Sequence, residues 1–303
     1  MLARGTLAGA MLLLTGATGL LGSALLPRLT AAGIPVRCLV RDPRRLGPER
    51  VRVQIALGDL ADPPSFRHAL RGVQTVVHLA ATVRDQPGGS IEELGGIATW
   101  RMVEAAERAG AERFVFTSAL GATAHDRTRL LRSKALAEDA VAGSRLTTTI
   151  IACSLLHAPG AGLVRMLERL SLLPVVPLVG HGRALVQPLW AQDAADCIAE
   201  CLRREPRVRH ERFELAGPET LSYAALARIV MGALGRRRPL VPVAEGLVRG
   251  ALRTSALLLD GRAPVTWDEA EMATVSLTTP RGVADARMLG VEPRRLVSVL
   301  GAG

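Results

Sequence analysis

The stretch TGATGLLG, at positions 15–22, places Gly16, Gly19 and Gly22 directly after an apolar run. In a turn from strand to helix, the first glycine permits the tight bend and the second lets the backbone approach a pyrophosphate, while the third lets the helix pack on the strand. The free N–H groups and the positive helix end then hold the phosphates. The candidate phosphate contacts are Gly16, Thr18, Gly19, Leu20, Leu21 and Gly22.

The sequence on both sides of this turn alternates strand and helix patterns. Apolar runs typical of buried strands cover 10–16, 35–42, 51–60, 73–81, 112–120 and 146–156. Helical spacing between them covers 20–33, 63–72, 95–110 and 127–143. Continuous apolar strands predict an α/β fold with a Rossmann-like, doubly wound parallel sheet. The first run leads straight into the glycine turn, so we interpret it as a strand and not as a signal peptide.

The regular alternation ends near residue 156. Proline and glycine cluster over 159–188, and a helix (192–204), a strand (210–216) and a helical region follow. We predict a dinucleotide-binding domain of residues 11–156, to which 183–216 contribute. Residues 157–182 and 217–303 then form a smaller, partly interleaved C-terminal substrate lobe.

Composition limits the classes of function. The chain has 303 residues, a net charge of +10 and 38 lysines and arginines, and only one of these, Lys134, is a lysine. The arginines are scattered and aromatic residues make up 3%, which argues against a nucleic-acid partner. No apolar run reaches 18 residues, and the four cysteines lack metal-ligand spacing. We therefore expect a cytoplasmic protein with reduced thiols and no metal.

The end of the second expected strand bears on which dinucleotide binds. An acidic residue there would accept hydrogen bonds from the ribose 2′-OH of NAD, whereas a guanidinium suits the 2′-phosphate of NADP. This chain has Arg41, followed by Asp42 and then by Arg44 and Arg45. The pattern favours NADP(H), and Asp42 keeps NAD(H) open.

Five stretches carry a resemblance to a known family. TGATGLLG, LGDL (57–60), VVHLAA (76–81), FVFTSALGA (114–122) and LRSKALAE (131–138) occur in the order and spacing of the short-chain dehydrogenase/reductase superfamily. Later stretches, including QPLWAQDAADCIAECL and FELAGPETLSYAALARIV, resemble its atypical group. That group includes NmrA-like proteins and the nucleotide-binding accessory subunit of respiratory complex I. The resemblance spans about residues 11–300.

The resemblance implies a role for individual residues. It places Asp59 and Leu60 against the adenine, and Leu79, Ala80 and Ala81 along the cofactor cleft. Ser118 falls at the position of the catalytic serine. Lys134 is the lysine of the family's YxxxK motif, which bonds the nicotinamide ribose and lowers the pKa of the tyrosine. The alternative for Lys134 is an ordinary surface lysine.

The chain departs from the family where the proton is transferred. The tyrosine of YxxxK is the general acid/base, and this chain has Leu130 there. Tyr223, the only tyrosine, is expected to pack in the second lobe. His125 and His157 are candidate replacement acids, because histidine exchanges protons near neutral pH. We expect His78, inside an apolar run, to be a buried core residue.

Two functions remain open. The first is a dinucleotide-binding protein with an accessory, assembly or redox-sensing role, in a protein complex. The second is an oxidoreductase or isomerase with another acid, acting on an apolar small molecule such as a quinone or an isoprenoid precursor. The segment 245–261 mixes leucine with arginine, as an interfacial helix at the inner membrane face does. The pattern fits better an amphipathic helix packed on the domain, because such helices are common in soluble proteins.

Overall fold

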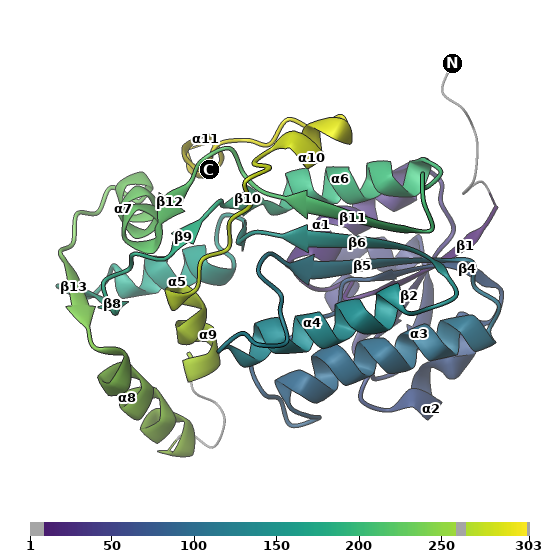
Figure 1. Ribbon diagram of the computed structural model, residues 1–303, viewed down its shortest axis with the longest axis horizontal. Coiled ribbons are helices and arrows are strands. Elements are labelled where there is room, and N and C mark those ends of the chain that lie inside the picture. Colours follow the sequence, from purple (N-terminus) through teal and green to yellow (C-terminus); the bar gives the residue numbers. More distant parts are fainter. Residues whose placement is uncertain (1–8, 259–264, 302–303) are drawn as a thin grey trace.

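A seven-stranded sheet forms the centre of the larger domain (Figure 1). The computed structural model describes residues 9–258 and 265–301. The strand order is β11-β6-β5-β4-β1-β2-β3, and every neighbouring pair is parallel. The strands are β1 (Met11–Thr15), β2 (Val36–Val40), β3 (Gln54–Leu57), β4 (Val73–His78), β5 (Arg113–Ala119), β6 (Thr147–Cys153) and β11 (His210–Leu215). This confirms the predicted α/β class with a parallel sheet.

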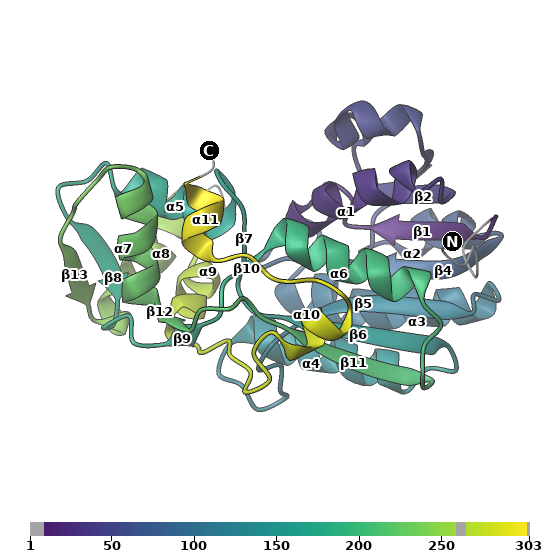
Figure 2. The same ribbon diagram turned by 90° about the horizontal axis from the view of Figure 1, so that it is seen from above.

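Helices cover both faces of the sheet, so the central strands are buried on two sides. α1 (Leu20–Ala31) and α6 (Ala191–Arg203) lie on one face, and α3 (Ala98–Arg108) and α4 (Arg129–Ala142) lie on the other (Figures 1 and 2). Each pair of helices closes a separate apolar core against the sheet. Because helices shield both faces of the sheet from water, the strands appear in the sequence as continuous apolar runs.

Two expected helices differ from their sequence prediction. The helix expected over 63–72 is a single turn, α2 (Pro63–Phe66), followed by a 3₁₀ turn (Arg67–Leu70). The helix expected over 95–110 begins with a π-helical turn (Glu93–Ile97). Ser133 of α4 accounts for that turn, because its Oγ accepts a hydrogen bond from Gly96 N at 2.9 Å and donates to the Ile91 carbonyl at 3.1 Å.

The smaller lobe is built from short elements around a third apolar core. Two-stranded sheets pair β8 (Val176–Val179) with β13 (Leu240–Val243) and β9 (Leu185–Val186) with β12 (Leu221–Ser222). Its helices are α5 (Gly162–Leu170), α7 (Tyr223–Ala233), α8 (Glu245–Leu258), α9 (Trp267–Glu271) and α11 (Leu296–Leu300). In 9–258 and 265–301, no helix is long and apolar enough to cross a membrane.

The chain crosses between the domain and the lobe several times. β7 (Leu156–His157) pairs with β10 (Leu189–Trp190), and α6 and β11 then return to the large domain. Near the C-terminus, α10 (Ala284–Met288) packs on β11, and the Asp285 carboxylate accepts a hydrogen bond from Glu214 N at 2.8 Å. The large domain and the lobe are therefore connected by several segments of the polypeptide and not by one linker.

Candidate functional site

The three glycines of the turn after β1 play different parts. Gly16 has φ +73°, and a Cβ there would lie 2.6 Å from Ala80 N. A Cβ on Gly22 would lie 2.1 Å from the Gly16 carbonyl oxygen. A Cβ on Gly19 would meet only that oxygen, at 3.2 Å, and otherwise open space. Packing requires the outer two glycines, whereas the middle one leaves room for a ligand to approach the backbone.

The start of α1 has the features of an anion site. Gly19 is its N-cap residue, without a side-chain cap, and the first turn contains no acidic residue. The first N–H groups of a helix lack partners within the helix and carry partial positive charge. Together with the open space at Gly19, this arrangement fits the phosphates of a dinucleotide.

The end of β2 presents the residues that bear on dinucleotide choice. The exposed Arg41 donates from Nη1 to Gln86 Oε1 at 3.2 Å. Asp42 accepts a hydrogen bond from the backbone of Arg44 at 3.0 Å and caps the following 3₁₀ helix. The Asp42 carboxylate is thus engaged locally, while Arg41 reaches the loop that follows β4.

The loops after β3 and β4 meet above the carboxyl ends of the strands. The half-buried Asp59 accepts a hydrogen bond from Ala61 N at 3.0 Å, and Leu60 follows it. A Cβ on Gly88 would lie 4.0 Å from Asp59 Oδ2, so the two loops approach each other. Leu79 N bonds the Thr15 carbonyl at 3.3 Å, and Ala81 is exposed. These residues and the glycine turn lie together at the edge of the sheet where the strands have their carboxyl ends.

His78, at the end of β4, supports this edge from within the core. Its ring bonds Thr15 Oγ1 through Nδ1 at 2.8 Å and Thr99 Oγ1 through Nε2 at 3.2 Å. Thr99 donates its own proton to Gly95 O at 2.7 Å, so Nε2 carries the ring proton and Nδ1 accepts from Thr15. Burial lowers the pKa of His78 to about 3, so the ring stays neutral. This confirms the expected core histidine.

Lys134 on α4 faces the ends of β5 and β6. Its Nζ donates to the Thr117 carbonyl at 2.6 Å and lies 4.8 Å from the centre of the Phe116 ring. Burial lowers the pKa of Lys134 to about 8. The lysine is half-buried and is not the surface residue of the alternative interpretation. Leu130, one turn earlier on the same helix face, is also half-buried.

The candidate proton donors lie in three different environments. Ser118 is buried on β5, and its Oγ has no hydrogen-bond partner among the described residues. His125 is exposed in the loop before α4. His157 is buried in β7 with both ring nitrogens unpartnered within the described chain, and burial lowers its pKa to about 4. No hydrogen bond among described residues joins any two of these groups.

Tyr223 lies in the smaller lobe, and no hydrogen bond among the described residues links its hydroxyl to α4. It is the first residue of α7 and is buried in the apolar core of the lobe. Burial raises the pKa of its hydroxyl above the usual range. The structure thus agrees with the expectation that Tyr223 packs in the lobe.

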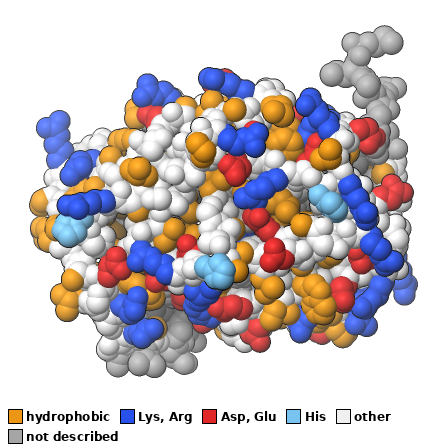
Figure 3. All heavy atoms as spheres, in the orientation of Figure 1, with side chains coloured by type: hydrophobic (Ala, Val, Ile, Leu, Met, Phe, Trp, Pro, Cys, Tyr) orange, Lys and Arg blue, Asp and Glu red, His pale blue; other side chains and the backbone are white. Residues whose placement is uncertain are grey.

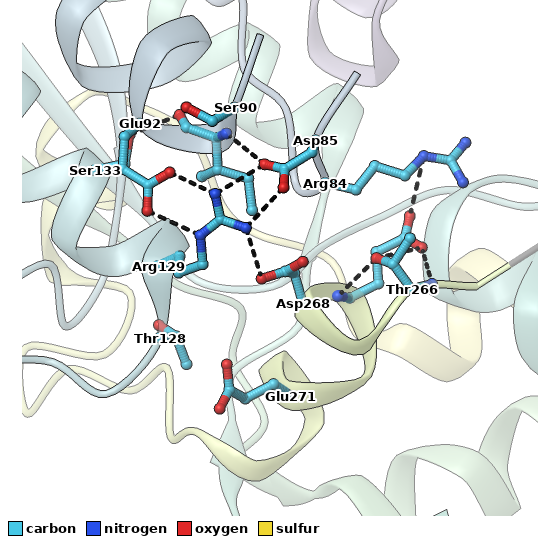
Figure 4. A network of polar contacts seen from close by, with 12 residues as sticks. Arg84, Asp85, Ser90, Glu92, Thr128, Arg129, Ser133, Thr266, Asp268 and Glu271 are labelled. Carbon is cyan, nitrogen blue, oxygen red and sulfur yellow. Dashed lines mark hydrogen bonds and ion pairs between the residues drawn. The ribbon is translucent and has the colours of Figure 1, made fainter. Parts of the chain in front are cut away.

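Arg129, to which the sequence analysis assigned no role, is the centre of a charged cluster (Figure 4). Its guanidinium makes paired hydrogen bonds to Asp85 at 2.9 Å and to Glu92 at 2.6 and 2.9 Å. It also lies 3.6 Å from Asp268 of α9. Arg129 lowers the pKa values of Asp85 and Glu92, whereas burial raises that of Asp268. Arg129 lies in the first turn of α4, where a positive charge is unfavourable because the N-terminus of a helix carries partial positive charge. This unfavourable position could have indicated from the sequence that Arg129 has acidic partners.

A cavity of about 500 Å³ lies beside this cluster, between α4, α8 and α9. Arg249 reaches over the Trp267 ring, 4.6 Å from its centre, and lies 3.8 Å from Glu271. The described part of 245–261 therefore packs on α9, while residues 259–261 lie outside the described residues. The lining residues are Asp85, Arg127, Arg129, Arg249, Leu252, Arg253, Ala256, Thr266, Trp267, Asp268 and Glu271.

The comparison with protein families agrees with this geometry. The sequence profile of the NAD(P)H-binding family matches residues 16–174, more than half of the chain. The chain belongs to this family, within the atypical short-chain dehydrogenase/reductases. Binding of NAD(P)(H) is therefore the class of function that fold and site define.

Individual relatives refine the position within the family. NADH dehydrogenase (ubiquinone) 1 alpha subcomplex subunit 9, mitochondrial, of Arabidopsis thaliana is 27% identical over 75% of this chain and 58% of that protein. The chain thus spans less than two thirds of that relative. NAD(P)H azoreductase of Xenophilus azovorans is 27% identical over 91% of this chain and 84% of its own length.

A solved structure shows the same fold. The NADPH-dependent quinone oxidoreductase QOR2 of Escherichia coli, complexed with NADPH, aligns with a TM-score of 0.73. The alignment covers 96% of this chain and 99% of that one, at 18% sequence identity. The resemblance to the atypical group, stated above from sequence stretches, is confirmed.

Proposed function

We propose that this protein binds NADP(H) and has an accessory, assembly or redox-sensing role, without the tyrosine acid–base step of its superfamily. One observation carries the proposal. Lys134 is present and half-buried beside Thr117, while position 130, on the same face of α4, holds leucine. Leucine has no proton to exchange. The chain therefore keeps the lysine that serves the cofactor and lacks the tyrosine that transfers the proton.

The cofactor contacts follow from the edge described above. The phosphates lie on the turn formed by Gly16, Thr18, Gly19, Leu20, Leu21 and Gly22. The adenine lies against Asp59 and Leu60, and Leu79, Ala80 and Ala81 line the cleft. Lys134 exchanges its bond to the Thr117 carbonyl for bonds to the ribose hydroxyls. When bound, the dinucleotide supplies or accepts a hydride.

Preference for NADP(H) rests on Arg41. Its guanidinium is exposed and makes one hydrogen bond to the neutral Gln86 amide, which a 2′-phosphate replaces with a stronger bond between two charged groups. Asp42 already accepts from Arg44 N and is less free to bond a ribose 2′-OH. Both features support NADP(H) over NAD(H).

The candidate donors give little support for proton transfer by another route. His157 is neutral at physiological pH, since burial lowers its pKa to about 4. Ser118 has no base bonded to it among the described residues. His125 is exposed, so its proton exchanges with solvent. These environments favour a role that depends on binding and on the redox state of the dinucleotide.

Calorimetric titration with NADPH and NADH tests the proposal. NADPH should bind more tightly, and Arg41→Ala should weaken NADPH binding roughly tenfold while leaving NADH unchanged, because one charge-assisted bond is lost. Arg50→Ala, at an exposed arginine nearby, is the matched control. Failure of both dinucleotides to bind would contradict the proposal, and equal affinity would contradict the NADP preference.

A protein partner is part of the proposed role. The relative from Arabidopsis thaliana is named as a subunit of NADH dehydrogenase, which motivates a complex in the cytoplasm or at the inner membrane face. Affinity capture from cells, with and without added NADPH, tests it. A partner whose recovery changes with the dinucleotide supports a sensing role, and recovery unaffected by it supports assembly alone.

An active oxidoreductase is the second candidate, favoured by the azoreductase named among the relatives. A conjugated acceptor takes a hydride and receives its proton from solvent, so tyrosine is not required. The charged cavity beside α4 suits polar acceptors better than the apolar quinone or isoprenoid class. NADPH oxidation with a quinone panel and sulfonated azo dyes tests this. Turnover would favour the enzyme, and its loss in Ser118→Ala, His125→Ala or His157→Ala would identify a side-chain proton donor in place of solvent.

A further inference from the structure

The end of the lobe farthest from the sheet carries apolar side chains on its surface. The turn between α5 and β8 exposes Leu172 to 66% and Leu173 to 46%, and Val175 follows. Leu234, after α7, and Val241, on β13, are exposed as well. In Figures 1 and 2, β8 and β13 lie at the left-hand end of the molecule. These five side chains lie in two segments, 172–175 and 234–241, which adjoin or belong to the paired strands β8 and β13.

Hydrogen bonds place two arginines beside the same turn, and Arg237 lies between them in the chain. Arg236 Nη1 donates to Ser171 Oγ at 2.7 Å and to Glu168 O at 3.1 Å, and Arg238 Nε donates to the Ser171 carbonyl at 3.2 Å. Val176 N bonds the Pro239 carbonyl at 2.9 Å, which holds β13 next to the turn. The arginine run and the two leucines therefore belong to one continuous surface.

This surface is strongly unbalanced in charge. Segments 157–190 and 220–244, which include this surface together with buried elements of the lobe, contain seven arginines and one acidic residue, Glu168, and are bordered by Glu219 and Glu245. Within the described part of the chain, none of the seven makes an ion pair. Figure 3 shows basic and hydrophobic side chains next to one another at the left-hand end of the molecule. The seven arginines are Arg165, Arg169, Arg183, Arg228, Arg236, Arg237 and Arg238.

We propose that this tip, defined by Leu172, Leu173, Val175, Leu234, Val241, Arg237 and Arg238, binds the surface of an anionic lipid bilayer. The leucines insert below the headgroups, and the long arginine side chains keep their charges at the phosphate level. The absence of ion pairs within the described residues leaves these guanidiniums for phosphates. Four of the five apolar side chains lie in turns or bends and Val241 lies on β13, an arrangement that suits shallow insertion.

Co-sedimentation of the full chain with vesicles tests the assignment. The protein should sediment with vesicles that contain phosphatidylglycerol. Far less protein should sediment with vesicles of pure phosphatidylcholine. Arg237→Ala and Arg238→Ala should each weaken binding about fivefold. Leu172→Ser and Leu173→Ser should each weaken it about tenfold. Raising the salt to about 1 M, where the Debye length is about 3 Å, should weaken binding to the wild type and leave a residual apolar component.

Val51→Ser and Val208→Ser, at exposed valines of the large domain, are the matched controls and should bind as the wild type does. All substituted side chains are exposed, so thermal midpoints should change little. Absence of binding to anionic vesicles would overturn the proposal, as would equal binding by the leucine variants. Concentration-dependent self-association that Leu172→Ser abolishes would overturn it in favour of a second copy covering the tip.

Discussion

Lys134 and Leu130 define the site at the scale of single residues. The ammonium donates to a backbone carbonyl on β5 and lies over the Phe116 ring, and burial lowers its pKa although both contacts favour the charged form. The leucine one turn earlier leaves this lysine without its usual partner. The residue-scale predictions concern this pair and the glycine turn.

Binding of NADPH should depend on the protonation of Lys134. The pKa of Lys134 in the free protein is about 8, below its usual value, so the charge is present below pH 8 and lost above it. The charge attracts an anionic ligand, so the dissociation constant should rise as pH increases through about 8. Calorimetry on wild type and Lys134→Met measures this. The variant should bind more weakly and lack this step; an identical pH profile would contradict the role.

Leu130→Tyr should restore the family pair. With Lys134 on the same face, phenolate and ammonium should stabilise each other, so the new phenol should ionise below its usual pKa of about 10 and the pKa of Lys134 should rise above about 8. Tyr223 does not interfere, because burial raises its pKa. Spectrophotometric titration of the variant measures the ionisation, and Leu130→Tyr with Lys134→Met is the control. A new phenol titrating at or above its usual pKa would show that position 130 does not face Lys134.

The glycines of the turn should respond differently to alanine. Gly22→Ala places a Cβ 2.1 Å from a backbone oxygen and should destabilise the fold by about 1–3 kcal/mol or more. Gly19→Ala meets one atom at 3.2 Å, so it should fold normally but bind dinucleotide weakly. Thermal melts together with NADPH titration separate the two effects. Loss of stability in Gly19→Ala as large as in Gly22→Ala would refute this division.

At the scale of elements, Arg129 ties three segments together. It joins the loop after β4, the residue before the π-helical turn and helix α9 through Asp85, Glu92 and Asp268, respectively. Arg84 lies 4.0 Å from Glu269 and adds a second link from the same loop to α9. The cluster therefore connects a loop of the dinucleotide domain to the lobe.

Arg129→Ala should loosen both partners of this link. Amide hydrogen exchange should accelerate in residues 82–92 and 265–271, because the carboxylates lose their shared cation. Arg129 lowers the pKa values of Asp85 and Glu92, so the stability they contribute is present above their unfolded pKa and is lost as pH falls through the folded values. The variant should thus lose less stability on acidification than the wild type. Arg108→Ala, at an exposed helix pair, is the control.

At the scale of the whole molecule, the C-terminal segment returns from the lobe to the sheet. Asp285 is fully buried, accepts from Glu214 N and lies 2.9 Å from Arg281. Core packing of α10 on the sheet joins the lobe to the large domain. The domain and the lobe should therefore unfold together.

Asp285→Ala should lower the stability of both parts at once. It leaves the Glu214 amide without its partner, at a cost of about 1–3 kcal/mol. Circular dichroism and tryptophan fluorescence should report the same unfolding transition, at a lower midpoint than in the wild type. The fluorescence signal includes Trp267 of the lobe. Arg281→Ala should cost less, because its side chain is half-exposed. Separate transitions for the two signals would show that the lobe unfolds independently.

The amino-acid sequence by itself determined the family, the parallel sheet and the loss of tyrosine. The glycine turn, the continuous apolar strands and Leu130 are local patterns, and their physical meaning depends on neighbours close in the chain. The role of His78 as a buried residue could be predicted for the same reason. The π-helical turn before α3 could not, because Ser133, some forty residues later, stabilises it.

Only the tertiary structure decided which distant charges meet. Asp85, Arg129 and Asp268 are far apart in the chain, and folding brings them together beside a cavity. Likewise, the leucines after α5 and the arginines before β13 form one surface because Ser171 holds Arg236 and Arg238. Side-chain contacts between distant segments depend on packing of the whole chain, and periodicity along the sequence does not encode them.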